Sequence, residues 1–292
     1  MKTMPLVLQP TIYFNGNYNY VDGMMSTQVP YSLSEAEGLL TRFMNAYSVL
    51  DNLDYMTEIV EEEENTFLFF YNDATHEPTL LQTPDYVPAE RVDNRAYDAA
   101  NTQRFSMEHS SLKVESAKQM SQYHVTMSAF LRLGEWFDYL REQGVYDNTR
   151  IILVADHGHA DKLEDRFLTV TQSGITEDLS TYYPLLMMKD FDSQEYQTSQ
   201  EFMTIADVPT LATNGLIESP VNPFTGKTIS SSEKTSHPQL VMRSNQWDIL
   251  VNNGTAFLPA RWASVEKDLR DPANWKFYDE PIVLTEHHLP QQ

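Results

Sequence analysis

The pattern of apolar and polar positions along the chain predicts buried strands that alternate with amphipathic helices. Short, continuous apolar runs rich in β-branched and aromatic residues are typical of strands buried on both faces. Three such runs occupy 66–71, 150–155 and 183–188. Longer stretches in which apolar residues recur every three or four positions predict helices over 116–143 and 201–214, the second broken by an internal proline.

Two of the predicted helices carry specific boundary signals. One should begin at Ser34, because Ser34 and Glu37 fit a capping box. Its apolar residues then recur at helical spacing at Leu40, Phe43, Tyr47 and Leu50. The helix over 116–143 should end at Gly144, a residue suited to helix termination. Its predicted buried stripe consists of Met127, Phe130, Leu133, Phe137 and Leu140.

The order of these elements predicts the fold class. A strand over 66–71, a polar excursion, a long helix and a strand over 150–155 make a crossover of the βαβ kind, which implies parallel pairing. We therefore expect an α/β fold with three α/β/α layers and a mainly parallel central sheet. Residues 1–235 should form this domain, and residues 236–292 a small terminal subdomain or tail. A truncated sheet would expose an apolar edge, which predicts homodimer formation or poor solubility unless something covers it.

Composition narrows the range of functions. The 292 residues are 41% hydrophobic, which is ample for a sizeable core. The formal net charge of −22 disfavours binding to nucleic acid or to anionic lipid. The absence of cysteine excludes disulfides, thiolate metal sites and a cysteine nucleophile. No apolar run approaches the roughly 18 residues of a bilayer span, so we expect the chain to be soluble as given.

Polar clusters follow two of the predicted strands. Asp156 and His157 come directly after the strand over 150–155 and offer a carboxylate oxygen and an imidazole nitrogen, ligand types that suit zinc or manganese. Gly158 should let the backbone leave the strand at a φ that other residues resist. His76 lies in a second polar cluster, after the strand over 66–71. Because ligands collect at the carboxyl ends of strands in α/β sheets, both clusters are candidate sites.

These residues resemble a known family over about residues 60–215. The matching motifs are Gly144-Val145-Tyr146-Asp147-Asn148-Thr149 before the strand, Asp156-His157-Gly158 after it, Thr75-His76-Glu77-Pro78, Tyr183-Pro184-Leu185-Leu186-Met187 and Asp207-Val208-Pro209-Thr210-Leu211. They are similar to the carboxyl half of the sulfatase branch of the alkaline phosphatase superfamily. The likeness is greatest to membrane-anchored, sulfatase-like proteins related to lipoteichoic acid synthase and other phosphoglycerol transferases.

The resemblance implies a metal-dependent reaction on sulfate or phosphate esters. By this likeness Asp156 and His157 would bind one divalent metal ion (manganese, magnesium, zinc or calcium), and His76 would contact the sulfate or phosphate group of the anionic substrate. In the family a phosphoryl or sulfuryl group moves onto a hydroxyl or modified cysteine nucleophile and then onto water or an acceptor alcohol. The metal lowers the pKa of the nucleophile and neutralises charge on the transferred group.

The chain departs from the family ahead of Thr66. The family places an acidic metal ligand and the nucleophile there, and the 65 residues before Thr66 hold neither pattern. No catalytic residue is therefore identified in this chain; Thr75 lies beside His76, where the family has no nucleophile. The resemblance thus implies the carboxyl-terminal part of a longer protein, with a fold truncated at its amino end. The missing amino-terminal segment would be its partner and its only link to a membrane, on the extracytoplasmic face.

Two other functions stay open. A catalytically inactive binding or interaction domain with the same fold would handle an anionic glycan or a protein partner, in line with the missing nucleophile. A cytoplasmic relative such as a cofactor-independent mutase also has Asp-His-Gly after a strand, but its other ligand motifs are not visible. Glu286-His287-His288 is a weaker candidate metal motif near the chain end.

Overall fold

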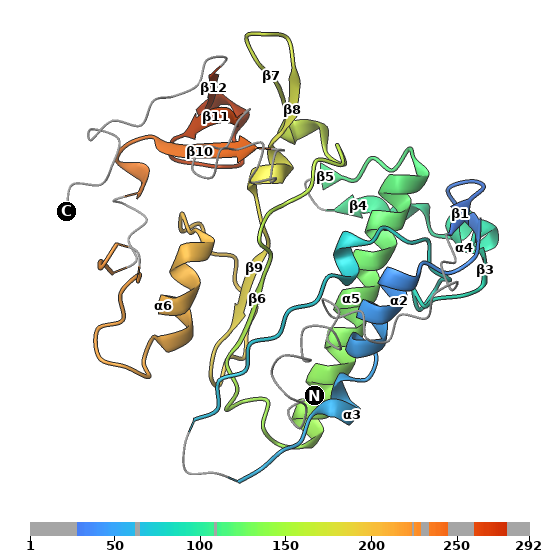
Figure 1. Ribbon diagram of the computed structural model, residues 1–292, viewed down its shortest axis with the longest axis horizontal. Coiled ribbons are helices and arrows are strands. Elements are labelled where there is room, and N and C mark those ends of the chain that lie inside the picture. Colours follow the sequence, from blue (N-terminus) through green and yellow to red (C-terminus); the bar gives the residue numbers. More distant parts are fainter. Residues whose placement is uncertain are drawn as a thin grey trace, which may run out of the picture. The chain divides into compact units, whose positions relative to one another are not determined.

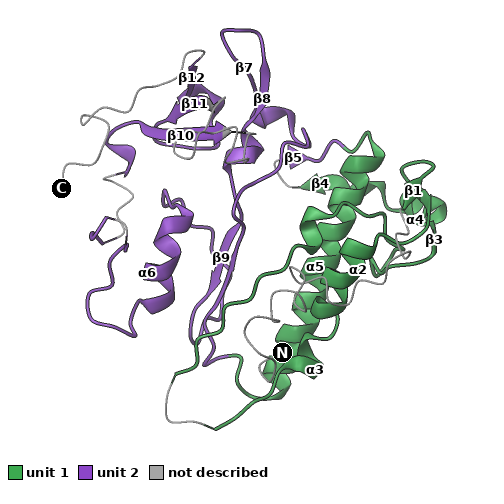
Figure 2. Cartoon of the chain, viewed as in Figure 1, with its two compact units in different colours: residues 1–107, 114–146 green, residues 108–113, 147–292 purple. Residues whose placement is uncertain are grey.

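The computed structural model describes residues 28–61, 65–107, 110–223, 225–228, 234–244 and 260–278. The chain divides into two compact units, shown in Figure 2. The first comprises Met1–Met107 and Val114–Tyr146, and the second Glu108–Lys113 and Asp147–Gln292. The division at residue 235 expected from the sequence stays a prediction.

The first unit is built on the long helix α5, Ala117–Glu142, which packs beside α2, Thr41–Leu50 (Figure 1). A capping box starts α5, because the Ser116 side chain accepts the Gln119 backbone N–H and the Gln119 side chain accepts the Ser116 backbone N–H. Gly144, with φ of 71°, follows the last turn. The helix predicted over 116–143 and its stop at Gly144 are confirmed.

The buried face of α5 differs from the predicted stripe. Its buried residues lie mostly in the amino-terminal half, namely Met120, Ser121, His124, Val125, Ser128 and Leu140. Of the predicted stripe only Leu140 is buried; Met127 and Leu133 are partly buried against the core, and Phe130 is exposed. The reason is that α2 and the turn Ala74–His76 pack against α5 and select the face that is covered.

The helix predicted from Ser34 is wrong at its start. Glu35–Glu37 forms strand β2, which pairs antiparallel with β1, Val29–Pro30, and with β3, Arg91–Asp93. Gly38 follows with φ of 91°, a left-handed value that separates the strand from the helix. The helix α2 then begins at Thr41, and Phe43, Tyr47 and Leu50 of the predicted apolar stripe are buried.

Smaller elements complete the first unit. They are α3 (Leu53–Met56), η3 (Ala74–His76), α4 (Arg95–Ala100), η4 (Thr102–Phe105) and β4 (Ser106–Met107). Phe43, Leu81 and Val125 have no exposed surface and form the centre of the main apolar cluster, with Tyr47, Leu50 and Tyr86 around them.

The second unit consists of short strands and turns. Its strands are β5 (Ser110–Ser111), β6 (Ile151–Val154), β7 (Leu168–Val170), β8 (Thr176–Asp178), β9 (Leu186–Lys189), β10 (Gln239–Ser244), β11 (Ala260–Val265) and β12 (Trp275–Tyr278). Its helices are η5 (Asp165–Phe167), η6 (Leu179–Tyr182), η7 (Ile205–Asp207), α6 (Val208–Thr213) and η8 (Pro272–Asn274). The helix predicted over 201–214 is thus confirmed only as η7 and α6.

The expected three-layer α/β/α fold with a mainly parallel sheet is wrong. All strand pairs whose register is described are antiparallel, in sheets of two or three strands. The strand predicted over 150–155 forms as β6, and the run over 183–188 contributes β9, but they pair antiparallel from Ile151↔Lys189 to Val154↔Leu186. The run over 66–71 forms no strand. Without that strand the described residues contain no parallel crossover, and β6 pairs instead with the predicted run over 183–188.

None of the described helices combines the length and the apolar character that crossing a bilayer requires.

Candidate functional site

Asp156 and His157 directly follow the last ladder contact of β6. That contact is the Ala155 N–H donating to the Leu185 carbonyl oxygen at 3.0 Å. The two side chains are exposed, and Asp156 Oδ2 lies 3.7 Å from His157 Nε2. The structure therefore confirms that β6 ends at this pair, although it does so in an antiparallel ribbon.

The imidazole of His157 is oriented by the backbone. Its Nδ1 lies 2.8 Å from the Gly158 carbonyl oxygen. Because a carbonyl oxygen can only accept, Nδ1 donates in this contact, and in the neutral ring Nε2 is then the nitrogen that carries a lone pair. Asp156 Oδ1 meanwhile accepts the His157 N–H at 2.9 Å, which leaves Oδ2 open. One nitrogen and one oxygen, 3.7 Å apart on exposed side chains, are thus the candidate metal ligands of this pair.

Position 158 requires glycine because there is no room for a side chain there, and not because the backbone has a positive φ. A Cβ atom built at this position would lie 1.7 Å from the Ser180 carbonyl oxygen. The Gly158 N–H also donates to the Thr181 carbonyl oxygen at 3.1 Å. The loop after β6 is therefore pressed against η6. The expectation of an unusual φ at Gly158 is wrong, because Gly158 is not among the glycines with positive φ.

Buried carboxylates hold the rest of this loop. His159 Nδ1 lies 2.8 Å from Oδ2 of Asp161, whose side chain is buried. The buried Asp178 accepts the Lys162 N–H at 2.7 Å and the Ser180 N–H at 3.0 Å. Since these carboxylates bind the chain itself, they keep the loop and η6 together.

His76 stands at the end of η3 in the first unit. Its side chain is exposed, and its Nδ1 lies 3.6 Å from Glu77 Oε1. Glu77 also lies 3.7 Å from Arg42. The segment before His76 is not a strand, so the predicted placement of His76 at a strand end is wrong. His76 belongs to the first unit, and the Asp156–His157 pair belongs to the second.

The residues present do not fit a complete metal site. Within the described ranges, no three His, Asp or Glu residues are placed together to hold an ion. Asp156 and His157 supply two ligands, whereas zinc takes about four and magnesium or calcium about six. A metal site here would need ligands from elsewhere. Glu286-His287-His288 lies outside the described residues.

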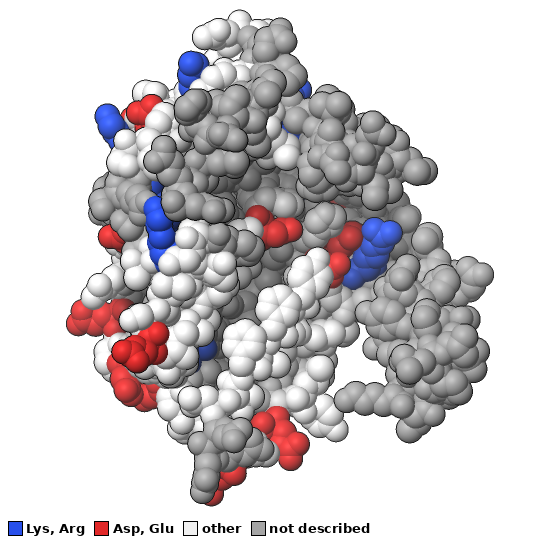
Figure 3. Space-filling view, turned by 60° about the vertical axis from the view of Figure 1, so that its left-hand side comes forward, with Lys and Arg blue, Asp and Glu red and all other residues white. Residues whose placement is uncertain are grey.

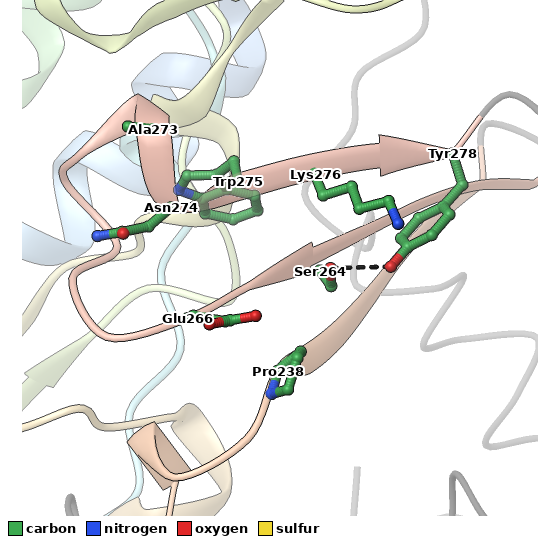
Figure 4. Close-up of a pocket in the computed structure, with 8 residues that line it drawn as sticks. All are labelled: Pro238, Ser264, Glu266, Ala273, Asn274, Trp275, Lys276 and Tyr278. Carbon is green, nitrogen blue, oxygen red and sulfur yellow. Dashed lines mark hydrogen bonds between the residues drawn. The ribbon is translucent and has the colours of Figure 1, made fainter.

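Two hollows among the described residues lie at places that the sequence prediction did not name. One, of about 290 Å³, lies on the β10–β11–β12 sheet (Figure 4). Ser264, Glu266 and Lys276 share this face, whereas Ala263 and Val265 are buried on the other. Strand alternation at 262–266 is the sequence signal that separates the two faces. The hollow is polar, and the Ser264 and Tyr278 hydroxyls bond each other at 3.0 Å.

The second hollow, of about 360 Å³, lies along β5 and η5. It is lined by Ser110, Ser111, Lys113, Glu164, Asp165 and Arg166. Its charges are paired with one another: Lys113 lies 3.0 Å from Asp165, and Arg166 lies 2.7 Å from Glu164. Ser110 Oγ also bonds Glu164. Because the cations are already matched by carboxylates, this hollow does not form an anion site.

Searches of protein-family models, of curated proteins and of solved structures find no match to this chain.

Proposed function

We propose that Asp156 and His157 are two ligands of a divalent-metal site in a sulfatase-like domain that acts on sulfate or phosphate esters. The observation that carries the proposal is the orientation of the pair at the end of β6. The Gly158 carbonyl fixes the His157 ring so that Nε2 is available, and Asp156 Oδ2 lies 3.7 Å away. A metal-bound histidine usually has its other nitrogen held in this manner.

The remaining parts of the site would come from outside the described residues. We propose that a preceding segment of a longer, membrane-anchored protein supplies the acidic ligand and the nucleophile, on the extracytoplasmic face. His76, exposed at the end of η3, would contact an oxygen of the ester group. When bound, the metal would supply Lewis-acid chemistry. Asp156 would contribute negative charge to such a site, and His157 would contribute an imidazole nitrogen.

Paramagnetic broadening by Mn²⁺ tests the pair directly, because it detects weak binding to an incomplete site. We expect Mn²⁺ to broaden the backbone amide NMR signals of residues 156–158 before others in the chain. Asp156→Ala or His157→Ala should remove this broadening. The matched control is Asp165→Ala, which removes another exposed carboxylate of the same unit. The assignment fails if the signals of 156–158 stay sharp, or if Asp156→Ala broadens like the unchanged chain.

A further inference from the structure

The segment before η3 exposes a continuous apolar run. Relative exposures are 79% for Phe67, 73% for Leu68, 78% for Phe69, 43% for Phe70 and 75% for Tyr71. Single exposed apolar residues are ordinary, but a contiguous apolar surface marks an interaction site. Successive residues of an extended chain point to opposite sides, so this segment is apolar on both faces. Figure 1 shows it as an open trace between α3 and η3.

The backbone of this run is unpaired as well. No residue of 66–71 makes a backbone hydrogen bond to any described part of the chain. The run is nevertheless anchored at its carboxyl end, where Asn72 Nδ2 donates to the Ala46 carbonyl oxygen at 2.9 Å. The Ala74 N–H in turn donates to Asn72 Oδ1 at 2.9 Å. An anchored segment with free N–H and C=O groups matches the hydrogen-bonding needs of a β-strand.

The charges beside the run decide against a second copy of this chain as its partner. Glu58 and Glu61 precede the run, and Asp73 follows it, all exposed. An antiparallel pair of copies centred on the run 66–71 would place Glu64 of each copy opposite Asp73 of the other. A parallel pair would set the glutamates side by side. Like charges directly opposite destabilise strand pairs, and the whole chain carries a net charge of −22.

The same charges favour a basic partner. On the face in Figure 3, white residues form a continuous area with acidic groups and a few basic groups around it. The charged residues next to the run in the sequence, Glu58, Glu61 and Asp73, are all acidic. We propose that residues 66–71 bind a β-strand of another polypeptide that is apolar on both faces and carries Lys or Arg at its ends. Backbone hydrogen bonds would give the affinity, and the acidic flanks would select the partner. This proposal does not depend on the metal site.

Hydrogen exchange of the intact chain with two matched peptides tests the proposal. Both peptides carry the core Val-Ile-Val-Phe-Val-Ile; one has two lysines at each end and the other two glutamates. We expect the amides of 66–71 to exchange rapidly in the free chain and to be protected by the lysine-flanked peptide. The glutamate-flanked peptide should bind at least about tenfold more weakly, with the difference shrinking as salt is added.

Variants locate the binding surface. Phe69→Lys should abolish the protection, whereas Tyr196→Lys should not, because Tyr196 is an equally exposed aromatic outside the run. Three results would overturn the proposal. Protection of 66–71 in the dilute free chain would mean that the chain covers the run itself. Protection that grows with chain concentration, together with dimers in sedimentation, would mean a second copy. Equal binding of both peptides would mean that charge does not select the partner.

Discussion

The helical core of the first unit and the run 66–71 place the same residue types in opposite surroundings. Phe43 of α2 is fully buried, with its ring 5.6 Å from that of Tyr47, whereas Phe67 is 79% exposed. Both phenylalanines lie in stretches predicted to be buried. A helix completes its backbone hydrogen bonds within itself and needs a partner only for its apolar face. A strand needs a second strand for every backbone group, so an apolar run without one stays open.

The largest difference between the two regions should appear in stability. Phe43→Ala should lower the free energy of unfolding by about 3–5 kcal/mol, because it leaves a cavity between α2 and α5. Phe67→Ala should change it by less than about 0.5 kcal/mol, since the exposed ring has few contacts to lose. Urea unfolding followed by circular dichroism measures both variants. Equal losses of unfolding free energy in the two variants would mean that Phe67 is packed in solution as tightly as Phe43. The run 66–71 would then not differ from the helical core.

A second prediction concerns the polar group inside that core. His124 has no exposed surface, and its Nδ1 accepts the Leu81 N–H at 3.0 Å. Burial, aided by the positive charge of Arg104, lowers the pKa of His124 to about 3. The unfolded chain, with a histidine pKa near about 6.5, therefore binds more protons than the folded chain between these values. The stability held by the neutral ring is complete above pH ~6.5 and falls as the pH drops toward about 3.

By pH ~4 the expected loss from His124 is on the order of 3 kcal/mol. Urea unfolding at a series of pH values measures it. His124→Gln keeps a polar side chain that cannot titrate, so its stability should fall less steeply with acid than that of the unchanged chain. Parallel pH profiles for the two proteins would show that His124 is protonated in the fold or reached by solvent. In either case water would reach the core around His124, although the side chain has no exposed surface in the structure.

Local signals account for what the sequence predicts of the fold. Ser116 and Gly144 bound α5 through interactions within a few residues, so its limits follow from the sequence. The apolar runs that contain β6 and β9 were also visible. Their antiparallel pairing was not, because the same runs are typical of parallel and antiparallel strands alike. The capping pattern at Ser34 was misleading because Gly38, with φ of 91°, interrupts the chain before the helix begins.

The candidate site shows the same limit. The position of Asp156 and His157 after a strand was predictable, because the apolar run ends there. The contact between Gly158 and the Ser180 carbonyl joins residues far apart in the sequence, so no local pattern indicates it. His76 was expected at a strand end and lies in a short turn instead, because the run before it has no strand partner. In both cases the sequence prediction lacked the neighbour that a residue meets from a distant part of the chain.

Two glycines repeat the contrast between packed and open surroundings on a smaller scale. Gly158→Ala should cost about 1–3 kcal/mol, because a Cβ 1.7 Å from the Ser180 oxygen forces the loop off η6. Gly134→Ala, inside α5 with nothing within 4 Å of the added atom, should instead stabilise the chain by about 0.5–1 kcal/mol. In thermal unfolding, Gly158→Ala should lower the melting temperature and Gly134→Ala should raise it.

The Thr181 carbonyl contact provides the structural readout for Gly158→Ala. In the unchanged chain the Gly158 N–H donates to that oxygen at 3.1 Å, so its exchange with solvent should be slow. The alanine variant should exchange this amide faster, while Gly134→Ala should leave it unchanged. If Gly158→Ala is neutral and its amide stays protected, the loop does not lie against η6. The fixed orientation of His157, on which the proposed metal site depends, would then lose its support.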